Sequence, residues 1–180
     1  DLVIGNEVNR EDVAKYNPTL VQAAMQYAKE QLPKYPGVTA WVTTCFSGTV
    51  LQYPSSPWQP VVDYCDKVVY LTVYPWYAGQ GVANPNNIDP QMVWSWNNGI
   101  KQVEARGKAV VIAEIGWPSA GRQDATVANE QINFGVTKRW IAGHNSLGRA
   151  FETFWFEMFD ESWKGNEGPW GPHWGLYTSG

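Results

Sequence analysis

The sequence predicts an α/β fold made of parallel βα units, of the (β/α)8 TIM-barrel type. Short apolar runs bounded by turn residues alternate along the chain with longer segments of helical periodicity, which is typical of parallel sheets with helical crossovers. No GxGxxG or GxxxxGK loop follows any apolar run, so a nucleotide-binding α/β fold is not indicated. Because no linker or internal repeat interrupts the pattern, we expect residues 1–180 to form one domain or one piece of a domain.

Five strands are expected, because five short runs are rich in Val, Ile, Tyr or Phe. They cover Leu2–Val8, Val38–Thr44, Val68–Pro75, Ala109–Gly116 and Ala150–Phe159. A complete barrel has eight strands and typically ~250 residues, so this chain of 180 residues accounts for about five βα units. The first residues, DLVIGNEVN, are typical of a strand and not of the charged start of a signal peptide. We therefore expect an N-terminally incomplete barrel.

Three helices are expected between these strands. The first covers Asn17–Leu32 and begins with Asn-Pro, which combines an N-cap residue with a proline at the first helical position. The second covers Asp89–Arg106, begins with Asp-Pro and stops at Gly107. The third begins near Thr126, repeats apolar residues at a spacing of four and ends by Gly143.

The composition favours a neutral partner. The formal net charge is −4 and Lys and Arg form no run, so binding to nucleic acid or to an anionic membrane is not indicated. No stretch reaches the roughly 20 apolar residues of a membrane-spanning helix. The chain carries 11 Trp, 9 Tyr and 6 Phe. Their flat apolar faces suit the C–H groups of sugars, although core packing accounts for many of them.

The two cysteines, Cys45 and Cys65, are expected to be free thiols. Cys45 follows the second expected strand and Cys65 precedes the third, so they lie at opposite ends of neighbouring parallel strands. That separation is roughly 15–20 Å at ~3.3 Å per residue, whereas a disulfide needs Cα atoms within about 7 Å. The cysteines form no zinc spacing with His144 and His173, and both histidines are expected to be structural or exposed.

Two carboxylates stand out, because each lies at the carboxyl end of an expected strand inside an apolar run. Glu7 is in VIGNEV and Glu114 is in VVIAEIGWP. Alternation along the strands puts Glu7 on a face with Val3 and Gly5, and Glu114 on a face with Ile112. If those faces line a barrel, both glutamates meet at its mouth. The alternative for each is a structural salt bridge or a solvated strand end, because a buried carboxylate is costly unless it is paired or used in chemistry.

Five motifs resemble, in order and spacing, those of family 17 glycoside hydrolases, the β-1,3-glucanase group. They are GNEV, VYPWYA, AEIGWPS, FEMFDESWKGNEG and HWGLY, and the resemblance runs from Leu2 to Tyr177. Members of that family are barrels with catalytic glutamates on strands four and seven, so the resemblance implies that this chain supplies strands four to eight. No metal or cofactor is expected. Serine and zinc hydrolases are not indicated, since no GxSxG elbow and no HExxH motif is present.

The resemblance implies that Glu7 is the general acid/base and Glu114 the nucleophile. Asn6 would hydrogen-bond the sugar 2-hydroxyl. Tyr74 would donate its hydroxyl to Glu114 and keep it ionised and oriented, with an ordinary core tyrosine as the alternative. Hydrolysis with retention needs one protonated and one ionised carboxyl about 5–5.5 Å apart.

Further substrate contacts are expected near the last strand and in the strand-end loops. Glu157 and Glu161 share a face of that strand, and Glu161 and Lys164 match a Glu and a Lys that plant members carry near the site. Glu157 and Asp160 depart from the plant pattern FAMFNE and resemble the bacterial and fungal branch, some members of which transfer glucan chains. An ion-pair network around Lys164 is the alternative. Stacking on glucose rings is expected from two or three of the loop aromatic residues Trp76, Tyr77, Trp117, Trp163 and Trp170. Trp76 and Trp117 are the two expected to bind substrate.

The predicted function is therefore retaining cleavage of a β-1,3-glucan such as laminarin by double displacement, with transfer to a sugar hydroxyl as a variant of hydrolysis. The alternative is a non-catalytic partial barrel that binds β-glucan. A missing N-terminal segment or a second chain would complete the barrel. The expected location is secreted, periplasmic or associated with the cell wall.

Overall fold

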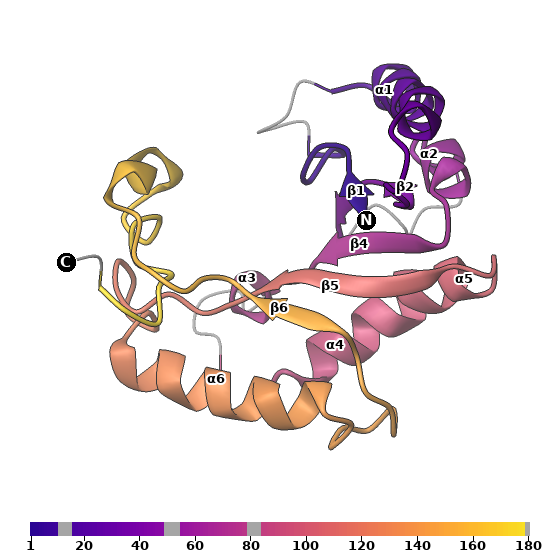
Figure 1. The fold of residues 1–180 in the computed structure, drawn as a ribbon. Helices are drawn as coiled ribbons and strands as arrows, with labels where there is room; N and C mark the ends of the chain where they lie inside the picture. The colour runs from indigo at the N-terminus through magenta and orange to yellow at the C-terminus, as the bar shows by residue number, and fades with distance from the viewer. Residues whose placement is uncertain (11–15, 49–54, 79–83, 179–180) are drawn as a thin grey trace. The chain divides into compact units, whose positions relative to one another are not determined.

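The computed structural model describes residues 1–10, 16–48, 55–78 and 84–178. The chain divides into two compact units. The first contains Asp1–Thr72 and Ser95–Ala113, and the second contains Val73–Trp94 and Glu114–Gly180. Strands and helices alternate along the chain (Figure 1), so the predicted α/β fold is confirmed.

Parallel strand pairs form the first unit. β1 (Leu2–Val3) pairs with β2 (Val42–Thr43), and β3 (Cys45–Ser47) pairs with β4 (Val68–Thr72), both in parallel. β5 (Ala109–Ile115) follows β4 in the strand order. The second expected strand is thus interrupted once, between β2 and β3, and extends three residues further than the sequence predicts.

The first expected strand is much shorter than predicted. β1 ends at Val3, although the ladder continues through the Ile4 amide, which donates to the Thr43 carbonyl at 2.8 Å. Gly5 and Glu7 then adopt φ values of 79° and 45°, which no strand residue has. The alternation expected to place Gly5 and Glu7 on the face of Val3 is therefore wrong, because the chain turns before Glu7 is reached.

The expected helices are present, with one irregularity. α1 (Pro18–Gln31) begins where predicted, with the Asn17 side chain accepting from the Leu20 amide at 2.8 Å. The second helix is divided into α4 (Asp89–Ser95), a π-helical turn η3 (Trp96–Ile100) and α5 (Lys101–Glu104). α6 (Val127–Ile141) is capped by Thr126.

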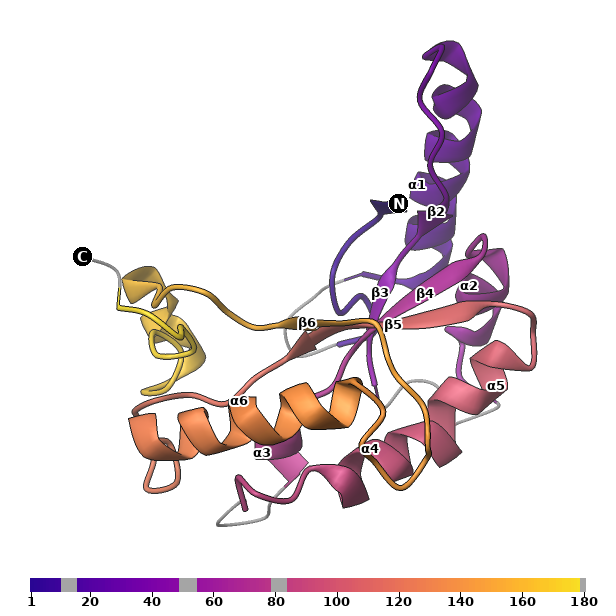
Figure 2. The same cartoon turned by 60° about the horizontal axis from the view of Figure 1, so that its bottom comes forward.

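Four short helical segments were not predicted from the sequence. They are α2 (Gln59–Tyr64), α3 (Pro75–Ala78) and the 3-10 turns η1 (Leu32–Lys34) and η4 (Ser162–Glu167). α2 fills the crossover between β3 and β4 and lies beside α1 (Figures 1 and 2). It was missed because six residues are too few for a helical period to show.

The second unit contains β6 (Thr153–Trp155) and α6, which runs beside β6 in both ribbon views (Figures 1 and 2). The Phe134 ring of α6 meets the Trp155 ring of β6 edge-on, with centroids 5.0 Å apart. The Phe156 amide donates to the Ile115 carbonyl at 2.9 Å, so the end of β5 and the end of β6 are neighbours. The fifth expected strand, Ala150–Phe159, is thus only three residues long.

Cys45 and Cys65 are both buried free thiols, as predicted. Cys45 pairs with Tyr70 in the ladder between β3 and β4, and Cys65 lies five residues earlier in the chain than Tyr70, before β4 begins. Each thiol donates to a nearby carbonyl, Cys65 Sγ to Val61 O at 3.3 Å and Cys45 Sγ to Phe46 O at 4.0 Å.

Within the residues that the structure describes, no helix is long and apolar enough to span a membrane.

Candidate active site

Glu7 is held by two side chains of the first unit. Thr72, the last residue of β4, donates its hydroxyl to Glu7 Oε1 at 2.5 Å, and Arg10 Nη1 lies 2.8 Å from Glu7 Oε2. Among the described residues Glu7 is the one non-glycine residue with a positive φ, and such strained conformations gather at functional sites. The carboxylate keeps a fixed direction while 15% of its side chain remains exposed. That combination suits a group that gives and takes protons.

Thr72 and Arg10 were not predicted from the sequence as partners of Glu7. Arg10 follows Glu7 by three residues, a spacing that brings side chains together in a turn, so this ion pair could have been anticipated. Thr72 could not, because its contact with Glu7 spans 65 residues of sequence. Asn6 is exposed next to Glu7.

Glu114 lies in the second unit, one residue before the end of β5. The Tyr74 hydroxyl donates to Glu114 Oε2 at 2.6 Å, as predicted. The backbone sets up this contact, because the Val73 amide donates to the Glu114 carbonyl at 2.9 Å. The hydroxyl of a neighbouring tyrosine fixes the direction of the carboxylate that accepts from it.

The ring of Tyr74 is fixed by three other aromatic rings. It meets Trp174 at a centroid distance of 5.1 Å, Tyr77 at 5.8 Å and Phe156 at 6.0 Å, each time edge-on. Such contacts are favourable because the positive edge of one ring faces the negative face of another. Tyr74 therefore reaches Glu114 from a rigid aromatic cluster. The importance of Trp174 was not recognised in the sequence.

Trp76 and Trp117 do not lie where a sugar could stack on them. Both are 0% exposed and belong to the core of the second unit. Their indole N–H groups are used internally: Trp76 donates to Asp124 Oδ1 at 3.2 Å and Trp117 to the Asp124 carbonyl at 2.9 Å. The expectation that these two indoles bind substrate is corrected, because a loop position at a strand end does not imply exposure.

Tyr77, Trp163 and Trp170 do offer aromatic surface in the second unit. Tyr77 is 53% exposed and Trp163 is 72% exposed. Trp170 is half-buried and its Nε1 donates to the Tyr77 hydroxyl at 3.2 Å. These three residues are the loop aromatic residues that remain available for stacking on glucose.

Lys164 joins Glu157 and Glu161 in one cluster. Its Nζ lies 3.0 Å from both carboxylate oxygens of Glu157 and also pairs with Glu161. Burial raises the pKa of Glu157 to about 7, against the opposing effect of Lys164. The hydrogen bond from Lys164 lowers the pKa of Glu161. The ion-pair network around Lys164, which was the alternative to a role in substrate binding, is present in the structure.

Glu130, in the first turn of α6, is a buried acid whose protonation affects stability. It is 4% exposed, and Oε1 has no hydrogen-bond partner among the described residues. Burial, together with the nearby Asp160 carboxylate, raises its pKa to about 8. An unfolded chain ionises this group near pH 4.5. The protonated Glu130 side chain therefore makes its full contribution to the stability of the folded state below pH 4.5. That contribution is lost as the pH rises towards 8.

We expect Glu130→Gln to stabilise the protein at pH 9 by on the order of 1–3 kcal/mol and to have little effect at pH 5. Urea unfolding at the two pH values measures the difference. The exposed Glu152 provides the matched control, since Glu152→Gln removes the same charge from the surface. A stability difference between Glu130→Gln and wild type that does not change with pH would contradict the assignment.

Gly116 permits the close approach of the segments that carry Glu114 and Glu157. A Cβ atom at Gly116 would lie 2.0 Å from the Phe156 carbonyl oxygen and 3.3 Å from the Trp174 ring. Backbone cannot yield as a side chain can, so the end of β6 would have to move.

We expect Gly116→Ala to destabilise the protein by ~1–3 kcal/mol, measured by urea unfolding. Gly135, in α6, is the control: nothing lies within 4 Å of a Cβ there, so Gly135→Ala should stabilise by up to ~1 kcal/mol. If both substitutions had the same effect, the close contact at Gly116 would not be what matters.

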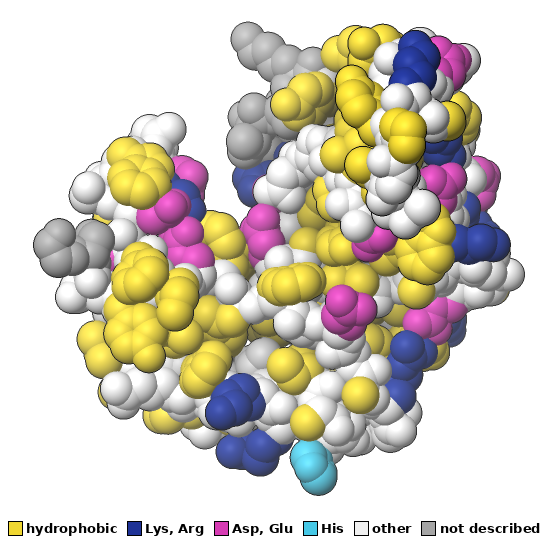
Figure 3. Space-filling model, viewed as in Figure 1, with side chains coloured by type: hydrophobic (Ala, Val, Ile, Leu, Met, Phe, Trp, Pro, Cys, Tyr) yellow, Lys and Arg dark blue, Asp and Glu magenta, His cyan; other side chains and the backbone are white. Residues whose placement is uncertain are grey.

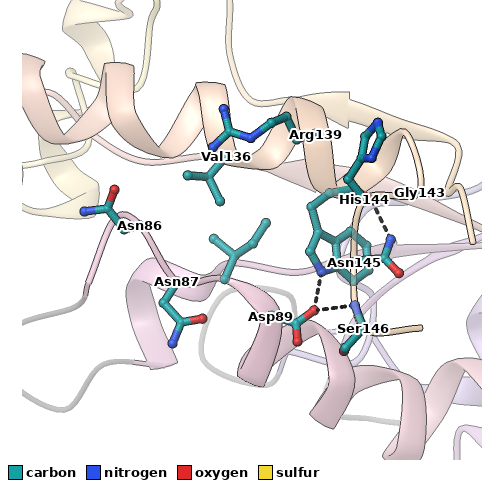
Figure 4. Close-up of a pocket in the computed structure, with 11 residues that line it drawn as sticks. Asn86, Asn87, Asp89, Val136, Arg139, Gly143, His144, Asn145 and Ser146 are labelled. Atoms are coloured by element: carbon teal, nitrogen blue, oxygen red, sulfur yellow. Dashed lines mark hydrogen bonds between the residues drawn. The ribbon is translucent and has the colours of Figure 1, made fainter. Parts of the chain in front are cut away.

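A separate pocket in the second unit lies between α6 and the start of α4 (Figure 4). Its volume is about 570 Å³, and its lining includes Arg139, His144 and Asn145. Its carboxylate, Asp89, already accepts from the Trp140 indole at 2.8 Å and the Ser146 amide at 3.3 Å. Neither predicted catalytic glutamate lines it.

Within the described residues, no group of three or more His, Cys, Asp or Glu side chains could hold a metal ion.

Comparison with known proteins identifies a family. A family model described as the BtgE/BtgC glycoside hydrolase domain matches residues 1–175. A glucan endo-1,3-β-glucosidase, btgC, from Emericella nidulans is 30% identical over 143 residues, covering 68% of this chain and 21% of the relative. A probable glucan endo-1,3-β-glucosidase, btgC, from Aspergillus fumigatus is 27% identical over 144 residues, covering 68% and 20%. The chain thus spans about a fifth of the length of these curated relatives.

Solved structures share the fold. An endo-laminarinase from Formosa Hel1_33_131 matches with a TM-score of 0.73 and 19% identity, over 98% of this chain and 53% of that one. An active-site mutant of a β-1,3-glucanosyltransferase from Rhizomucor miehei, in complex with laminaritriose, matches with a TM-score of 0.71 and 22% identity, over 99% and 59%. Since the family model covers residues 1–175, the chain belongs to the BtgE/BtgC glycoside hydrolase domain family, and the resemblance to glycoside hydrolase family 17 is confirmed.

Proposed function

We propose that this chain carries the catalytic residues of a retaining glycoside hydrolase that acts on β-1,3-glucan. Glu114 is the nucleophile and Glu7 the general acid/base. The hydrogen bond from Tyr74 to Glu114, 2.6 Å long, is the observation that carries the proposal, because it orients a carboxylate at a strand end of a glycoside hydrolase domain. The names of the relatives, which are glucan endo-1,3-β-glucosidases, support the substrate class.

The proposed reaction is a double displacement. Glu114 attacks the anomeric carbon while Glu7 gives its proton to the leaving glycosidic oxygen, which forms a covalent glucosyl-Glu114 intermediate. Glu7 then takes a proton from the incoming water, or from a sugar hydroxyl in the transfer variant, and the Glu114 carboxylate is released. The mechanism requires the two carboxyl groups to approach within about 5–5.5 Å.

The remaining predicted residues bind substrate in this proposal. Asn6 hydrogen-bonds the sugar 2-hydroxyl, and the cluster of Glu157, Glu161 and Lys164 presents polar atoms to sugar hydroxyls. Tyr77, Trp163 and Trp170 provide the exposed aromatic faces on which glucose rings stack.

We further infer that this chain supplies strands four to eight of a barrel, and that more of the same polypeptide or a second chain completes it. Exposed apolar side chains in the first unit support this inference. They include Leu2, Val3, Tyr27, Tyr35, Val38 and Trp41, and Figure 3 shows hydrophobic surface over α1. Parallel sheets are normally covered on all sides.

Since the proposed substrate is a polymer, we place the protein outside the cytoplasm, as a secreted, periplasmic or wall-associated protein.

Product analysis on a laminarin oligosaccharide tests the proposal. The expected result is shorter oligosaccharides whose new reducing ends appear first as the β-anomer by NMR, because two inversions restore the configuration. Products longer than the substrate would reveal transfer. An initial α-anomer would contradict the retaining mechanism. Glucan binding without any product, at the intact mass of the chain, would favour the non-catalytic glucan-binding alternative.

A further inference from the structure

Asp124 is a buried carboxylate in the loop that follows β5, and no role in the reaction described above is assigned to it. Its side chain is 1% exposed. Oδ1 accepts from Arg122 Nε at 2.6 Å and from Trp76 Nε1 at 3.2 Å, and Oδ2 accepts from Arg122 Nη2 at 2.6 Å. Burying a charge is costly unless it is paired and hydrogen-bonded. Here the pairing is extensive, so the loop is built around this carboxylate.

Arg122 and Asp124 together fix Trp76 from three directions. Asp124 holds the indole N–H, the Arg122 guanidinium lies over the ring with 3.7 Å between Cζ and the centroid, and Arg122 Nη2 donates to the Trp76 carbonyl at 3.3 Å. A cation over the face of Trp is attractive, and more so where water is excluded. Trp76 itself is 0% exposed, so neither ring nor backbone can shift without breaking these contacts.

Trp76 in turn supports Tyr74, the residue that donates to Glu114. The Trp76 ring meets the Trp174 ring edge-on at 5.5 Å, and the Trp174 ring meets the Tyr74 ring at 5.1 Å. Trp76 also follows Tyr74 by two residues in the chain. The contacts therefore form a continuous packed path from the Asp124 carboxylate to the Tyr74 hydroxyl, all within the second unit.

We propose that Asp124 is a positioning residue for Glu114. By holding Trp76, and through it Trp174 and Tyr74, Asp124 keeps the Tyr74 hydroxyl 2.6 Å from Glu114 Oε2. It acts without touching substrate. This inference rests on the proposed function, in which Glu114 is the nucleophile. A displacement of the order of 1 Å in a catalytic group lowers a rate by about 100-fold, which sets the scale of the expected effect.

The test measures the nucleophile alone, with 2-deoxy-2-fluoro-β-laminaribiosyl fluoride as the probe. Glu114 forms a bond to the anomeric carbon as the C–F bond breaks and fluoride leaves, so no acid is needed. The 2-fluoro group slows the second step, and the labelled peptide containing Glu114 is detected by mass. The rate at saturating probe reports on the attack, and the half-saturating probe concentration reports on binding.

We expect Asp124→Ala to lower the saturating labelling rate by about 30- to 100-fold with the half-saturating concentration unchanged. Asp124→Asn keeps the volume and an acceptor for Trp76 but not the charge facing Arg122, so its loss should be smaller. Tyr74→Phe should be slow as well. If Asp124 acts through Tyr74, the double variant Asp124→Ala/Tyr74→Phe should be no slower than the slower single variant, because coupled residues are not additive.

The control removes a comparable ion pair from the first unit. Lys29 Nζ lies 2.6 Å from Asp66 Oδ1, so Asp66→Ala should lower stability without changing the labelling rate per folded molecule. Rates are corrected for the folded fraction by circular dichroism. If Asp124→Ala does not fold, Asp124→Asn carries the comparison.

Three outcomes would overturn the inference. Wild-type labelling rates in the folded Asp124 variants would show that Asp124 does not position the nucleophile, and additive losses in the double variant would show that it does not act through Tyr74. A wild-type protein with the barrel completed that takes no label at Glu114 would instead remove the proposed function, and the inference with it.

Discussion

Replacing Glu114 with Gln is expected to lower laminarin cleavage by more than ~100-fold and to leave glucan binding intact. Gln has nearly the same volume as Glu, so the aromatic cluster around Tyr74 keeps its packing. What is lost is the attacking oxygen: an amide cannot form the glucosyl intermediate. The Tyr74 hydroxyl, which donates to Glu114 Oε2, can still donate to the amide oxygen, so a change in folding is not expected to account for the loss.

Reducing-sugar release measures the effect, and isothermal titration with a laminarin oligosaccharide measures binding. Glu152→Gln, at an exposed position of the same unit, removes one negative charge and should change neither. Residual cleavage above about one per cent of wild type, a loss of less than the ~100-fold expected, would exclude Glu114 as the nucleophile. Loss of binding together with cleavage would show that Glu114 holds substrate but does not attack it.

The fold was predictable wherever local signals are strong. Asn17 was predicted as a helix cap and caps α1, the third helix begins near Thr126 as expected, and β5 covers all but one residue of its predicted range. The ends of strands were not predictable in the same way, because apolar runs continue past the last ladder hydrogen bond. At Glu7 the run VIGNEV continues while the backbone has already turned, which only the positive φ of Gly5 and Glu7 reveals.

The candidate site was predictable where two residues meet through neighbouring strands. Tyr74 and Glu114 occupy the ends of two expected strands, so their contact follows from the order of the sheet. Trp76 and Trp117 were mistaken for surface residues because a sequence does not say which loop side chains fold inward. In the folded chain Asp124 accepts a hydrogen bond from each indole, with its carboxylate from Trp76 and with its backbone carbonyl from Trp117. A single aspartate in the loop sequence WPSAGRQDAT carries no local sign of that role.

Replacing Glu7 with Ala is expected to abolish cleavage of laminarin, whose leaving group needs a proton, and to preserve the first step on an activated substrate. With 2,4-dinitrophenyl β-laminaribioside the phenolate leaves unaided, so the glucosyl-Glu114 intermediate forms and then persists, because no base activates water. Azide needs no base. It should attack the intermediate in the space left by Glu7 and restore turnover by ~10-fold or more.

The surroundings of Glu7 favour this rescue. Without the Glu7 carboxylate, the Arg10 guanidinium that lies 2.8 Å from it and the Thr72 hydroxyl that donates to it lose a negative partner, so an anion should be attracted to the same place. The product should be the β-glycosyl azide, identified by NMR, since azide attacks from the side that Glu7 served. Glu30→Ala, on the exposed side of α1, should show wild-type cleavage and no response to azide. An α-azide, or a Glu7→Ala variant whose intermediate does not respond to azide, would contradict the acid/base role of Glu7.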